Sequence, residues 1–480
     1  MKLSEILRNI PCTINGEDKE IRTIEYDSRR VKEGALFVAV RGYQTDGHLY
    51  IDKAIENGAA AILCEEYQGK ADIPIVFTGD TRMGLSAAAA NFYGNSASRL
   101  KIIGVTGTNG KTTVTYLIKK VLDLVGIKTG LIGTNQNMIG DEVIETGRTT
   151  PESADLHKLL KTMEESGVTH VVMEVSSHAL ALSRVFGIKF ETGIFTNLTQ
   201  DHLDFHNTME EYCDTKSKLF AQSKKGCVNT DDMWGKVIAK KAVAPIMSYA
   251  VNDDADIKAE NIKLSERSVK FTIKYNGEEH EIRLGIPGYF SVYNALSAIC
   301  ACLSIGIDIE DIKKGLILAQ GVKGRAEVVP LPAKYTVMID YAHTPDGLEN
   351  IIKTVKGYAK SRTITVFGCG GDRDRTKRPK MGKVAGELSD FCIVTSDNPR
   401  SEEPWMIVKD ILEGMVGLEG KFDVVVDRTQ AIETAMRMAN DGDVIILAGK
   451  GHETYQILKD RTIDYDERVI VKEIFQKITE

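Results

Sequence analysis

The segment between residues 104 and 113 has the residue types and spacing of a phosphate-binding loop. It reads Gly-Val-Thr-Gly-Thr-Asn-Gly-Lys-Thr-Thr, with the lysine at position 111. Glycines let backbone N–H groups approach phosphate oxygens, Lys111 can reach the β- and γ-phosphates, and the Thr112 hydroxyl can bind Mg²⁺. The full GxxxxGK(S/T) pattern requires glycine at position 105, where this chain has Val. Gly107 instead begins a shorter GxxGKT pattern. The segment predicts a bound nucleotide but no particular reaction. The alternative is a glycine-rich turn with an exposed lysine.

Two further segments bring possible metal ligands to the ends of predicted strands. Glu174 lies near the end of the apolar run 171–175, where a carboxylate at the carboxyl edge of a parallel sheet could bind Mg²⁺. Two histidines and two aspartates fall within 201–206, after the apolar run 193–196. We expect metal or phosphate contact there, with His202 as the favoured ligand. The alternatives are an acid that faces solvent at a strand end and a purely structural histidine.

Lys216 lies on a predicted helix, on one face with Tyr212 and Phe220. A lysine on a partly apolar stripe usually extends its amine to water. The other interpretation is a desolvated, neutral amine that reacts with CO₂ to form a carbamate, which is an anionic metal ligand. Desolvation lowers the pKa of a lysine, as that chemistry requires. The residue types alone do not decide between the two interpretations.

A short motif near the C-terminal end could bind an amino acid. Asp397-Asn-Pro-Arg400 follows a predicted strand, and a loop in that position would line a ligand crevice. The Arg400 guanidinium can bind a carboxylate through two N–H groups. The alternative is a turn at a strand end with a surface arginine, and the motif alone leaves both open.

These segments require parallel strands to position them. The chain has 480 residues, enough for about three domains. We expect an α/β protein with a small N-terminal α/β domain (1–98), a central P-loop, parallel-sheet domain (99–326) and a C-terminal Rossmann-like, doubly wound domain (327–480). Asn276-Gly277 predicts a hairpin in an antiparallel excursion at 250–285. Strands are expected at 35–40, 60–64, 75–77, 100–106, 171–175, 193–196, 337–339, 364–367, 391–395, 423–426 and 444–447, and helices at 85–93 and 114–125.

Composition excludes several classes of protein. The formal net charge is −7, without a long basic run, which argues against nucleic acid as a partner. No apolar run approaches the roughly 18 residues of a membrane span, and the N-terminus is too charged for a signal peptide. The eight cysteines form no CxxC pair, and Cys300 and Cys302 lie in an apolar run expected to be core. We expect a cytoplasmic, soluble protein, because scattered thiols fit a reducing compartment.

Ten motifs together resemble those of a known family. They are GTNGKTT, MEVSSHAL, TNLTQDHLDFH, YCDTKSKLF, VNTDD, GRAE, DYAHTPD, GCGGDRDRTKRP, DNPR and AGKGHE, in this order between residues 107 and 453. In these motifs and their order the chain resembles the Mur ligases, and the motifs extend across the central and C-terminal expected domains. It implies an ATP-dependent ligase that forms an amide bond, releases ADP and makes a peptidoglycan precursor for the cell wall.

The resemblance also implies roles for particular residues around ATP. Thr112 and Glu174 would bind one Mg²⁺, and His202 and the carbamate of Lys216 a second. The catalytic residues would be Lys111, Glu174, His202 and Lys216. The residues that would contact ATP are Gly107, Thr108, Asn109, Gly110, Lys111, Thr112, Thr113, Asn294, Arg325 and Asp340.

Two more substrates are implied by the resemblance. UDP-MurNAc-L-Ala-D-Glu would be held through its uridine nucleotide by Ser28 and Gly42, and through its muramoyl-peptide by Thr149, Thr150, Ser176 and Arg184. The amino acid would be meso-diaminopimelate, bound by Arg373, Asp397, Asn398, Pro399, Arg400, Gly449 and Glu453. Arg groups suit the distal carboxylate of diaminopimelate and Glu453 suits its ammonium, whereas L-lysine would leave Arg400 unpaired. A monomer without nucleic-acid partners is expected.

The expected mechanism transfers the γ-phosphoryl group of ATP to a carboxylate. The resulting acyl phosphate is attacked by an amine, and domain closure protects it from water. His343 and His206 are candidates for the base that deprotonates the amine. Three alternatives stay open: ligation of L-lysine or another amino acid, a P-loop kinase or NTPase, and a nucleotide-binding regulator without catalysis.

Overall fold

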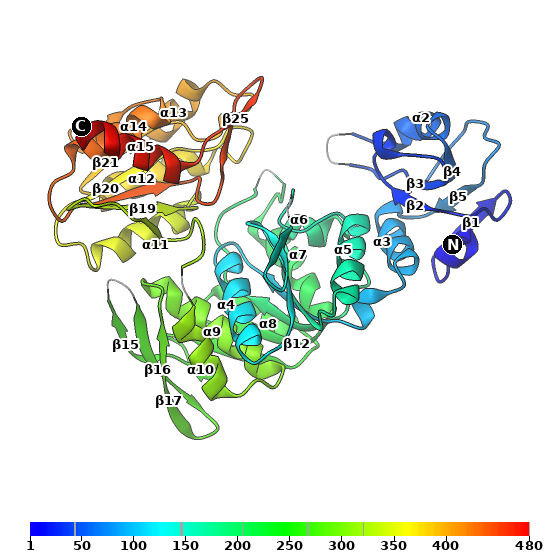
Figure 1. Ribbon diagram of the computed structural model, residues 1–480, viewed down its shortest axis with the longest axis horizontal. Coiled ribbons are helices and arrows are strands. Elements are labelled where there is room, and N and C mark those ends of the chain that lie inside the picture. The colour runs from blue at the N-terminus through cyan, green and yellow to red at the C-terminus, as the bar shows by residue number, and fades with distance from the viewer. Residues whose placement is uncertain (43–44, 145–146, 204, 266–267, 320, 480) are drawn as a thin grey trace.

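The computed structural model describes residues 1–480 except 43–44, 145–146, 204, 266–267, 320 and 480. The chain forms three α/β units in sequence order, and the first and last units lie on opposite sides of the middle one (Figure 1). The expected fold class, a three-part α/β protein, is confirmed. The exact boundaries at 98/99 and 326/327 stay predictions. No helix in the described part of the chain is both long and apolar enough to cross a bilayer.

The first unit contains a five-stranded sheet in the order β1-β5-β4-β3-β2. Strand β1 is antiparallel to β5, and the other neighbours are parallel. Strand β3 is buried on both faces, as expected of a parallel strand covered on each side. The elements are α1 (Leu3–Ile6), β1 (Cys12–Asn15), β2 (Thr23–Glu25), η1 (Ser28–Arg30), β3 (Ala35–Val38), η2 (Gly47–Tyr50), α2 (Ile51–Glu56), β4 (Ala59–Cys64), β5 (Ile75–Thr78), α3 (Thr81–Phe92) and η3 (Ser96–Ser98).

Helix α3 joins the first unit to the middle one. It begins at Thr81, earlier than the apolar pattern predicted, because Asp80 accepts two backbone N–H groups of the first turn. The Ser86 hydroxyl on this helix donates to the carbonyl oxygen of Phe186 in the middle unit (2.8 Å). The cap sets where α3 begins, and the Ser86 contact is one of those that join the first unit to the middle one.

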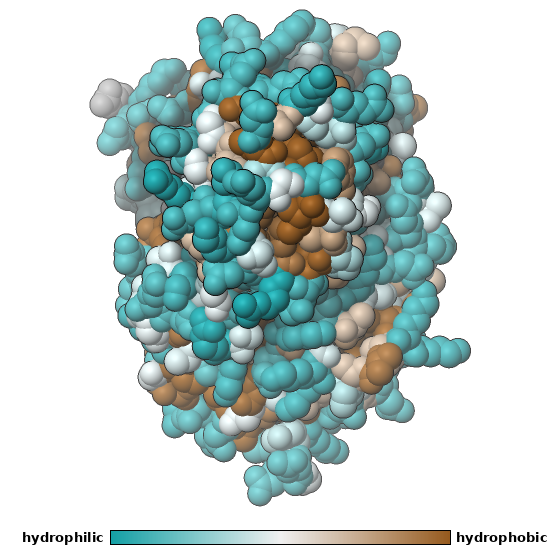
Figure 2. Space-filling view, turned by 90° about the vertical axis from the view of Figure 1, so that its right-hand side faces the viewer, coloured by the Kyte–Doolittle hydropathy of each residue, from teal (hydrophilic) through white to brown (hydrophobic). Residues whose placement is uncertain are grey.

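The side of the molecule where the first unit lies is mostly hydrophilic, with an apolar area in its upper half (Figure 2). Exposed apolar side chains of this unit include Leu49 and Tyr50 in η2. They follow the segment at Gly42 that is predicted to hold uridine. Exposed aromatic and apolar side chains are a surface on which a nucleotide base can pack.

The middle unit contains a nine-stranded sheet in the order β14-β13-β12-β11-β6-β10-β7-β8-β9. Strand β6 pairs in parallel with β10 on one side and β11 on the other. The carboxyl ends of these three strands are therefore adjacent, and the segments that follow them must lie together. The strands are β6 (Lys101–Thr106), β7 (Thr129–Ile132), β8 (Asn137–Ile139), β9 (Glu142–Ile144), β10 (His170–Glu174), β11 (Phe190–Phe195), β12 (Ser223–Asn229), β13 (Ile246–Ala250) and β14 (Ile257–Lys258). The helices are α4 (Lys111–Leu124), α5 (Ser153–Glu165), α6 (Ser177–Ala181), α7 (Met209–Ala221), α8 (Met233–Lys241), α9 (Tyr289–Ser304) and α10 (Ile309–Leu318).

A separate antiparallel sheet extends the middle unit, as the sequence predicted. Its order is β15-β16-β17, with β15 (Glu260–Leu264), β16 (Val269–Tyr275) and β17 (Glu278–Leu284). Asn276 and Gly277 form the turn between β16 and β17, and both have positive φ (51° and 83°), as a two-residue hairpin requires. The sheet packs into the same core as α9, where Cys300 and Cys302 are fully buried. The expectation that these two cysteines are core residues is confirmed.

The third unit is an open doubly wound sheet in the order β18-β19-β23-β20-β21-β22, with only β18 antiparallel to its neighbour. Apolar cores cover both faces. The loops after β20, β21 and β23 leave the carboxyl edge and carry the three motifs predicted to bind an amino acid. The strands are β18 (Glu327–Val329), β19 (Thr336–Asp340), β20 (Thr363–Phe367), β21 (Phe391–Val394), β22 (Phe422–Val424), β23 (Val444–Ala448), β24 (Tyr455–Ile457) and β25 (Thr462–Asp464). The helices are α11 (Pro345–Lys356), α12 (Lys377–Leu388), α13 (Pro404–Leu412), α14 (Arg428–Met438) and α15 (Glu467–Thr479).

A buried ion pair supports the carboxyl edge of this sheet. Nε of Arg428 donates to Glu467 (2.8 Å), and both side chains have no exposed area. The same guanidinium donates to the carbonyl oxygen of Ala448 (2.9 Å), the last residue of β23. The pair therefore fixes two helices to the strand end that leads into the 449–453 loop.

We expect Arg428→Met to destabilise the protein by about 3–5 kcal/mol, because it leaves the Glu467 carboxylate buried without its partner. Arg437→Met is the matched control, since Arg437 pairs with Glu433 on the exposed side of the same helix. Urea unfolding followed by circular dichroism compares the two variants. Equal losses of stability would contradict the importance of the buried pair.

Candidate active site

The segment after β6 forms a tight loop that leads into α4. Gly107 has a φ of +146°, and a Cβ at this position would lie 1.9 Å from the Thr196 hydroxyl oxygen, so only glycine fits. Lys111 folds back over the loop, and its Nζ donates to the carbonyl oxygens of Gly107 (2.9 Å) and Thr108 (2.8 Å). Burial lowers the pKa of Lys111. The predicted loop and its helix are thus present, with the lysine held over the loop backbone.

A second lysine reaches the same carbonyl oxygen. Nζ of Lys216 on α7 donates to Gly107 O (3.0 Å) and lies 4.5 Å from the centre of the Tyr212 ring. Lys216 is 1% exposed, so the interpretation in which its amine extends to water is wrong. Burial, and then the charge of Lys111, hold the pKa of Lys216 well below its usual value. The desolvated amine of the second interpretation is therefore present and its burial favours the neutral form, while the carbamate itself stays a prediction.

Glu174 is buried at the carboxyl end of β10. Its two carboxylate oxygens accept hydrogen bonds from the backbone N–H (2.9 Å) and the hydroxyl (3.0 Å) of Thr134. The Thr134 hydroxyl also lies 3.0 Å from that of Thr149, and the Thr150 hydroxyl donates to the Glu174 carbonyl oxygen (2.8 Å). The fold thus brings the predicted Mg²⁺ ligand together with two threonines predicted to bind substrate.

Ser176 and Arg184 complete this group of predicted substrate contacts. The Ser176 hydroxyl lies 3.4 Å from that of Thr150. Arg184 donates to the Thr150 carbonyl oxygen (3.2 Å) and to the Glu152 carboxylate (3.2 Å). Burial lowers the pKa of Arg184, and Glu152 offsets this only in part. The carboxylate of Glu152, which the sequence analysis did not single out, holds the arginine at this edge.

The loop after β11 contacts the third unit through an acid and a histidine. His202 Nε2 lies 3.3 Å from Asp201, and burial lowers the pKa of His202 to about 3, so that the ring is neutral and able to bind a metal. Asp201 lies 3.4 Å from Nζ of Lys377 and 3.7 Å from Nε2 of His343, both in the third unit. Burial opposes the ionised form of Asp201, but these neighbours and His202 hold its pKa well below the usual value. Asp204, singled out with this segment, lies outside the described residues.

The two histidines considered as bases differ in access. His206 is buried and stacks on Tyr212 (4.7 Å between ring centres), and neither of its ring nitrogens has a hydrogen-bond partner within the described chain. Burial lowers the pKa of His206 to about 4. The His343 side chain is 38% exposed at the junction between the middle and third units. Of the two, His343 keeps a side that a substrate amine can reach.

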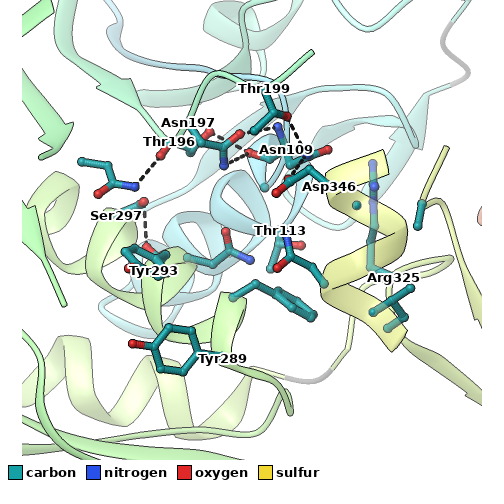
Figure 3. A pocket seen from close by; sticks show the side chains of 18 of the residues that line it. Asn109, Thr113, Thr196, Asn197, Thr199, Tyr289, Tyr293, Ser297, Arg325 and Asp346 are labelled. Atoms are coloured by element: carbon teal, nitrogen blue, oxygen red, sulfur yellow. Dashed lines mark hydrogen bonds between the residues drawn. The ribbon is translucent and has the colours of Figure 1, made fainter. Parts of the chain in front are cut away.

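A cavity of about 320 Å³ lies between the phosphate loop, α9 and α11 (Figure 3). Asn294, Arg325 and Asp340, predicted at the domain junctions, all line it. Asn109 of the phosphate loop donates to the Asp346 carboxylate on α11 (2.7 Å), so the wall is shared between the middle and third units. Tyr289 lies at one end of the cavity and Arg325 at the other (Figure 3). The volume and the mixed lining suit a small polar ligand.

The residues near the phosphate loop fit a magnesium ion that arrives with a nucleotide. The Thr112 hydroxyl accepts a hydrogen bond from Arg325 (3.2 Å), and Glu174 provides a buried carboxylate. Within the described residues, no group of three or more His, Cys, Asp or Glu side chains forms a metal site. Mg²⁺ in nucleotide sites is bound by one or two protein ligands together with phosphate and water. The donor set therefore matches nucleotide-bound magnesium rather than a preformed metal centre.

A second cluster lies at the carboxyl edge of the third sheet. Arg400 Nη1 donates to the carbonyl oxygens of Gly371 (2.9 Å) and Asn398 (3.4 Å), and Arg373 Nη1 donates to the carbonyl oxygen of Asp372 (2.9 Å). In the part of the chain that the structure describes, neither guanidinium is paired with a carboxylate. Burial, and then the charge of Arg373, lower the pKa of Arg400. The two arginines thus lie together without a direct ion pair to a carboxylate among the described residues, although Asp397 and Glu453 are near Arg400.

The remaining residues predicted around the amino acid lie in the same cluster. Asn398 donates to Glu453 (2.8 Å), and a Cβ on Gly449 would lie 2.4 Å from the Asp397 carboxylate. Ser28 and Gly42 instead lie in the first unit, where Asn57 donates to the Ser28 carbonyl oxygen (2.8 Å). The structure therefore brings together the predicted ATP residues and, separately, the predicted amino-acid residues.

Some residues at these sites were missed in the sequence. Asp346 lies in the DYAHTPD motif, but no role was predicted for it. It contacts Asn109, which is 237 positions away in the sequence. Gln200 Nε2 donates to Thr376 across the same junction (2.8 Å). Local spacing carries no signal for such pairs, because they depend on how two units meet.

A phosphate loop at a junction between α/β units defines the class of P-loop nucleotide-binding proteins. Three family models match successive parts of the chain: "Mur ligase family, catalytic domain" at residues 20–93, "Mur ligase middle domain" at 105–302, and "Mur ligase, glutamate ligase domain" at 324–451. The chain belongs to the Mur ligase family.

Relatives of full length are similar over the whole chain. A UDP-N-acetylmuramoyl-L-alanyl-D-glutamate–2,6-diaminopimelate ligase from Clostridium botulinum is 49% identical over 100% of both chains. A solved structure of a ligase with the same name is 30% identical and has a TM-score of 0.71, covering 100% of this chain and 99% of the other. The MurF ligase of Thermotoga maritima, solved in complex with ADP, shares the fold at 19% identity and a TM-score of 0.63, covering 95% and 97%.

We expect Lys216→Met to be more stable than the wild type at neutral pH in CO₂-depleted buffer. An unfolded lysine has a pKa near about 10.4, and the folded value lies far lower, so below pH 10 the unfolded state binds the extra proton and is favoured. Stability of the wild type should rise with pH, and the gap to the variant should close as pH approaches 10. Lys218→Met, on the exposed side of α7, is the control in thermal unfolding scans. A gap that does not change between pH 7 and 10 would contradict a neutral Lys216.

Proposed function

We propose that this chain is an ATP-dependent ligase that joins meso-diaminopimelate to the D-glutamate carboxylate of UDP-MurNAc-L-Ala-D-Glu. The names of full-length relatives at 49% identity support this substrate pair. The family-wide motifs lie at two sites that a ligase of three substrates requires, one for a nucleotide and one for an amino acid. The product would be a precursor of peptidoglycan. ATP and UDP-linked precursors are cytoplasmic metabolites, so we propose action in the cytoplasm, as a monomer.

One observation carries this proposal: the phosphate loop faces the third unit, which holds the cationic amino-acid cluster. The pairs Asn109–Asp346 and Asp201–Lys377 both cross this junction. A kinase or simple NTPase has no need for a second α/β unit with unpaired arginines at its carboxyl edge. A ligase does, because its amine must reach an acyl phosphate formed at the phosphate loop.

Charge neutralisation by the phosphate loop would drive the first step. The carboxylate oxygen of D-glutamate attacks the γ-phosphorus of ATP, the bond to the bridging oxygen breaks, and ADP leaves. Lys111 is positioned over the loop to move onto the phosphates, and the N-terminus of α4 adds partial positive charge. Thr112 and Glu174 would hold Mg²⁺, which supplies Lewis-acid stabilisation when bound. Thr149, Thr150, Ser176 and Arg184 are proposed to hold the muramoyl-peptide beside them.

The second step would be attack by the amine of diaminopimelate on the acyl phosphate. The tetrahedral intermediate expels phosphate and leaves the amide. His343, partly exposed at the junction, is the proposed acceptor of the amine proton. The close approach of the third unit to the 199–202 loop would exclude water from the acyl phosphate. Ser28 and Gly42 are proposed to anchor the uridine nucleotide in the first unit.

Lys216 is proposed to carry a carbamate that, with His202, completes a second magnesium site. The carbamate forms when the neutral amine adds to CO₂ and loses one proton. Burial of Lys216 and its position beside the phosphate loop support this proposal. Adding bicarbonate to the stability comparison of the wild type and Lys216→Met tests it. We expect bicarbonate to stabilise only the wild type.

Diaminopimelate rather than L-lysine is favoured by the unpaired arginines. Arg373 and Arg400 would bind the distal carboxylate that lysine lacks, and Glu453 the distal ammonium. Lysine would leave the partly buried guanidinium of Arg400 without the carboxylate it is proposed to bind, which is unfavourable.

A coupling assay tests the proposed function. The full chain is incubated with ATP, Mg²⁺ and UDP-MurNAc-L-Ala-D-Glu, with diaminopimelate, L-lysine or other amino acids. We expect an amide product and ADP with diaminopimelate, and little product with lysine. A phosphorylated product without amide formation would instead favour the kinase, and equal use of both amino acids would contradict the specificity argument.

We expect Arg400→Lys to raise the KM for diaminopimelate at least about tenfold, since a single ammonium cannot form the two parallel N–H contacts of a guanidinium. The KM for ATP should change far less, because Arg400 belongs to the amino-acid cluster. Arg375→Lys is the control, since Arg375 pairs with Asp410 on the surface of the same unit. Steady-state kinetics with each substrate varied in turn provides the measurement, and parallel increases in both KM values would count against this assignment.

A further inference from the structure

A fully buried lysine beside the amino-acid cluster has no role in the steps above. Lys450 lies in the turn after β23 and has no exposed area. Its ammonium donates to Asn398 Oδ1 (3.2 Å) and to Glu453 Oε2 (3.0 Å). The rings of Tyr455 and Tyr465 lie 5.9 and 5.7 Å from it. A lysine so enclosed requires a reason, because an ammonium is otherwise among the groups least often buried.

Lys450 determines how the amide of Asn398 is oriented. Oδ1 of Asn398 also receives the backbone N–H of Ile457 (2.9 Å). An ammonium and a backbone N–H can only donate, so the atom between them must be the amide oxygen. The amide nitrogen is thereby turned toward Glu453, to which it donates at 2.8 Å. The orientation of Asn398 thus follows from its two donors.

Lys450 and Asn398 together fix one oxygen of the Glu453 carboxylate. Both donate to Oε2, while within the described residues Oε1 has no hydrogen-bond partner. Glu453 is 9% exposed, so the carboxylate is held at the edge of the cluster with one oxygen occupied and one available. A buried carboxylate without such donors would be left unpaired and free to turn, which is unfavourable.

From this network we infer that Lys450 is a positioning residue for recognition of the distal ammonium of the amino-acid substrate. It acts by holding the Glu453 carboxylate turned so that Oε1 faces the ligand. The inference rests on the proposed function, and it assigns the two distal groups of the substrate to separate parts of the cluster. Arg373 and Arg400 recognise the distal carboxylate. Glu453, which Lys450 positions, recognises the distal ammonium.

The discriminating probe is 2-aminopimelate, which keeps the carbon chain and distal carboxylate of diaminopimelate but lacks the distal ammonium. The ratio of kcat/KM for diaminopimelate to that for 2-aminopimelate measures how strongly the ammonium is recognised. In Lys450→Met we expect this ratio to fall at least tenfold, with the KM for ATP changed by less than about twofold. A general structural defect would lower activity with both amino acids and leave the ratio unchanged.

Two further variants test whether Lys450 acts through Glu453. Glu453→Gln should lower the ratio similarly, and adding Lys450→Met to it should lower the ratio little further, because the two residues form one unit. Lys450→Gln, which keeps an N–H donor without the charge, serves if Lys450→Met does not fold, and it should also lower the ratio. An unchanged ratio in the folded Lys450 variants, or additive losses in the double variant, would overturn the inference.

Coupling assays on the wild type distinguish a failure of this inference from a failure of the proposed function. If the wild type couples neither amino acid, the proposed function fails. If it couples diaminopimelate and 2-aminopimelate equally well, the proposed function stands and the role of Lys450 is overturned.

Discussion

The carbonyl oxygen of Gly107 accepts hydrogen bonds from two lysine amines that come from different helices. Two ammonium groups that share one buried acceptor repel each other, which favours the neutral form of one of the two amines. Lys216 is the more buried of the two, and its pKa is the more strongly lowered. The fold thus places, side by side, the lysine of the phosphate loop and a desolvated amine whose burial favours its uncharged form.

This arrangement follows from the order of strands in the middle sheet. Because β6 lies between β10 and β11, the phosphate loop, Glu174 and the segment with His202 meet at one edge. The third unit approaches this edge through α11 and the start of α12. The pairs Asn109–Asp346 and Asp201–Lys377 connect the two units there. A nucleotide bound here would touch both units, so its binding and their relative position are coupled.

Much of the fold and of the nucleotide site could be predicted from the sequence, because these parts depend on local residue patterns. The phosphate loop, the strand that ends at Glu174 and the hairpin at Asn276-Gly277 are each set by neighbouring residues, and the structure has all three. The partners of Lys216 and Asp201 could not be predicted, since helical spacing places Tyr212 beside Lys216 but says nothing of Gly107, 109 residues away. Lys450 was missed for a similar reason: its acceptor Asn398 lies on another loop, and only the adjacency of β23, β20 and β21 brings the loops together.

The central claim is that cationic groups at this junction let a carboxylate oxygen attack the γ-phosphorus of ATP. Its most direct test uses UDP-MurNAc-L-Ala-D-Glu labelled with ¹⁸O in the reacting carboxylate, followed by mass spectrometry of the phosphate released during coupling. The account predicts that one labelled oxygen is transferred to each phosphate, because the acyl phosphate contains that oxygen and amine attack expels it. Phosphate that carries no label, or label found in AMP, would contradict the account.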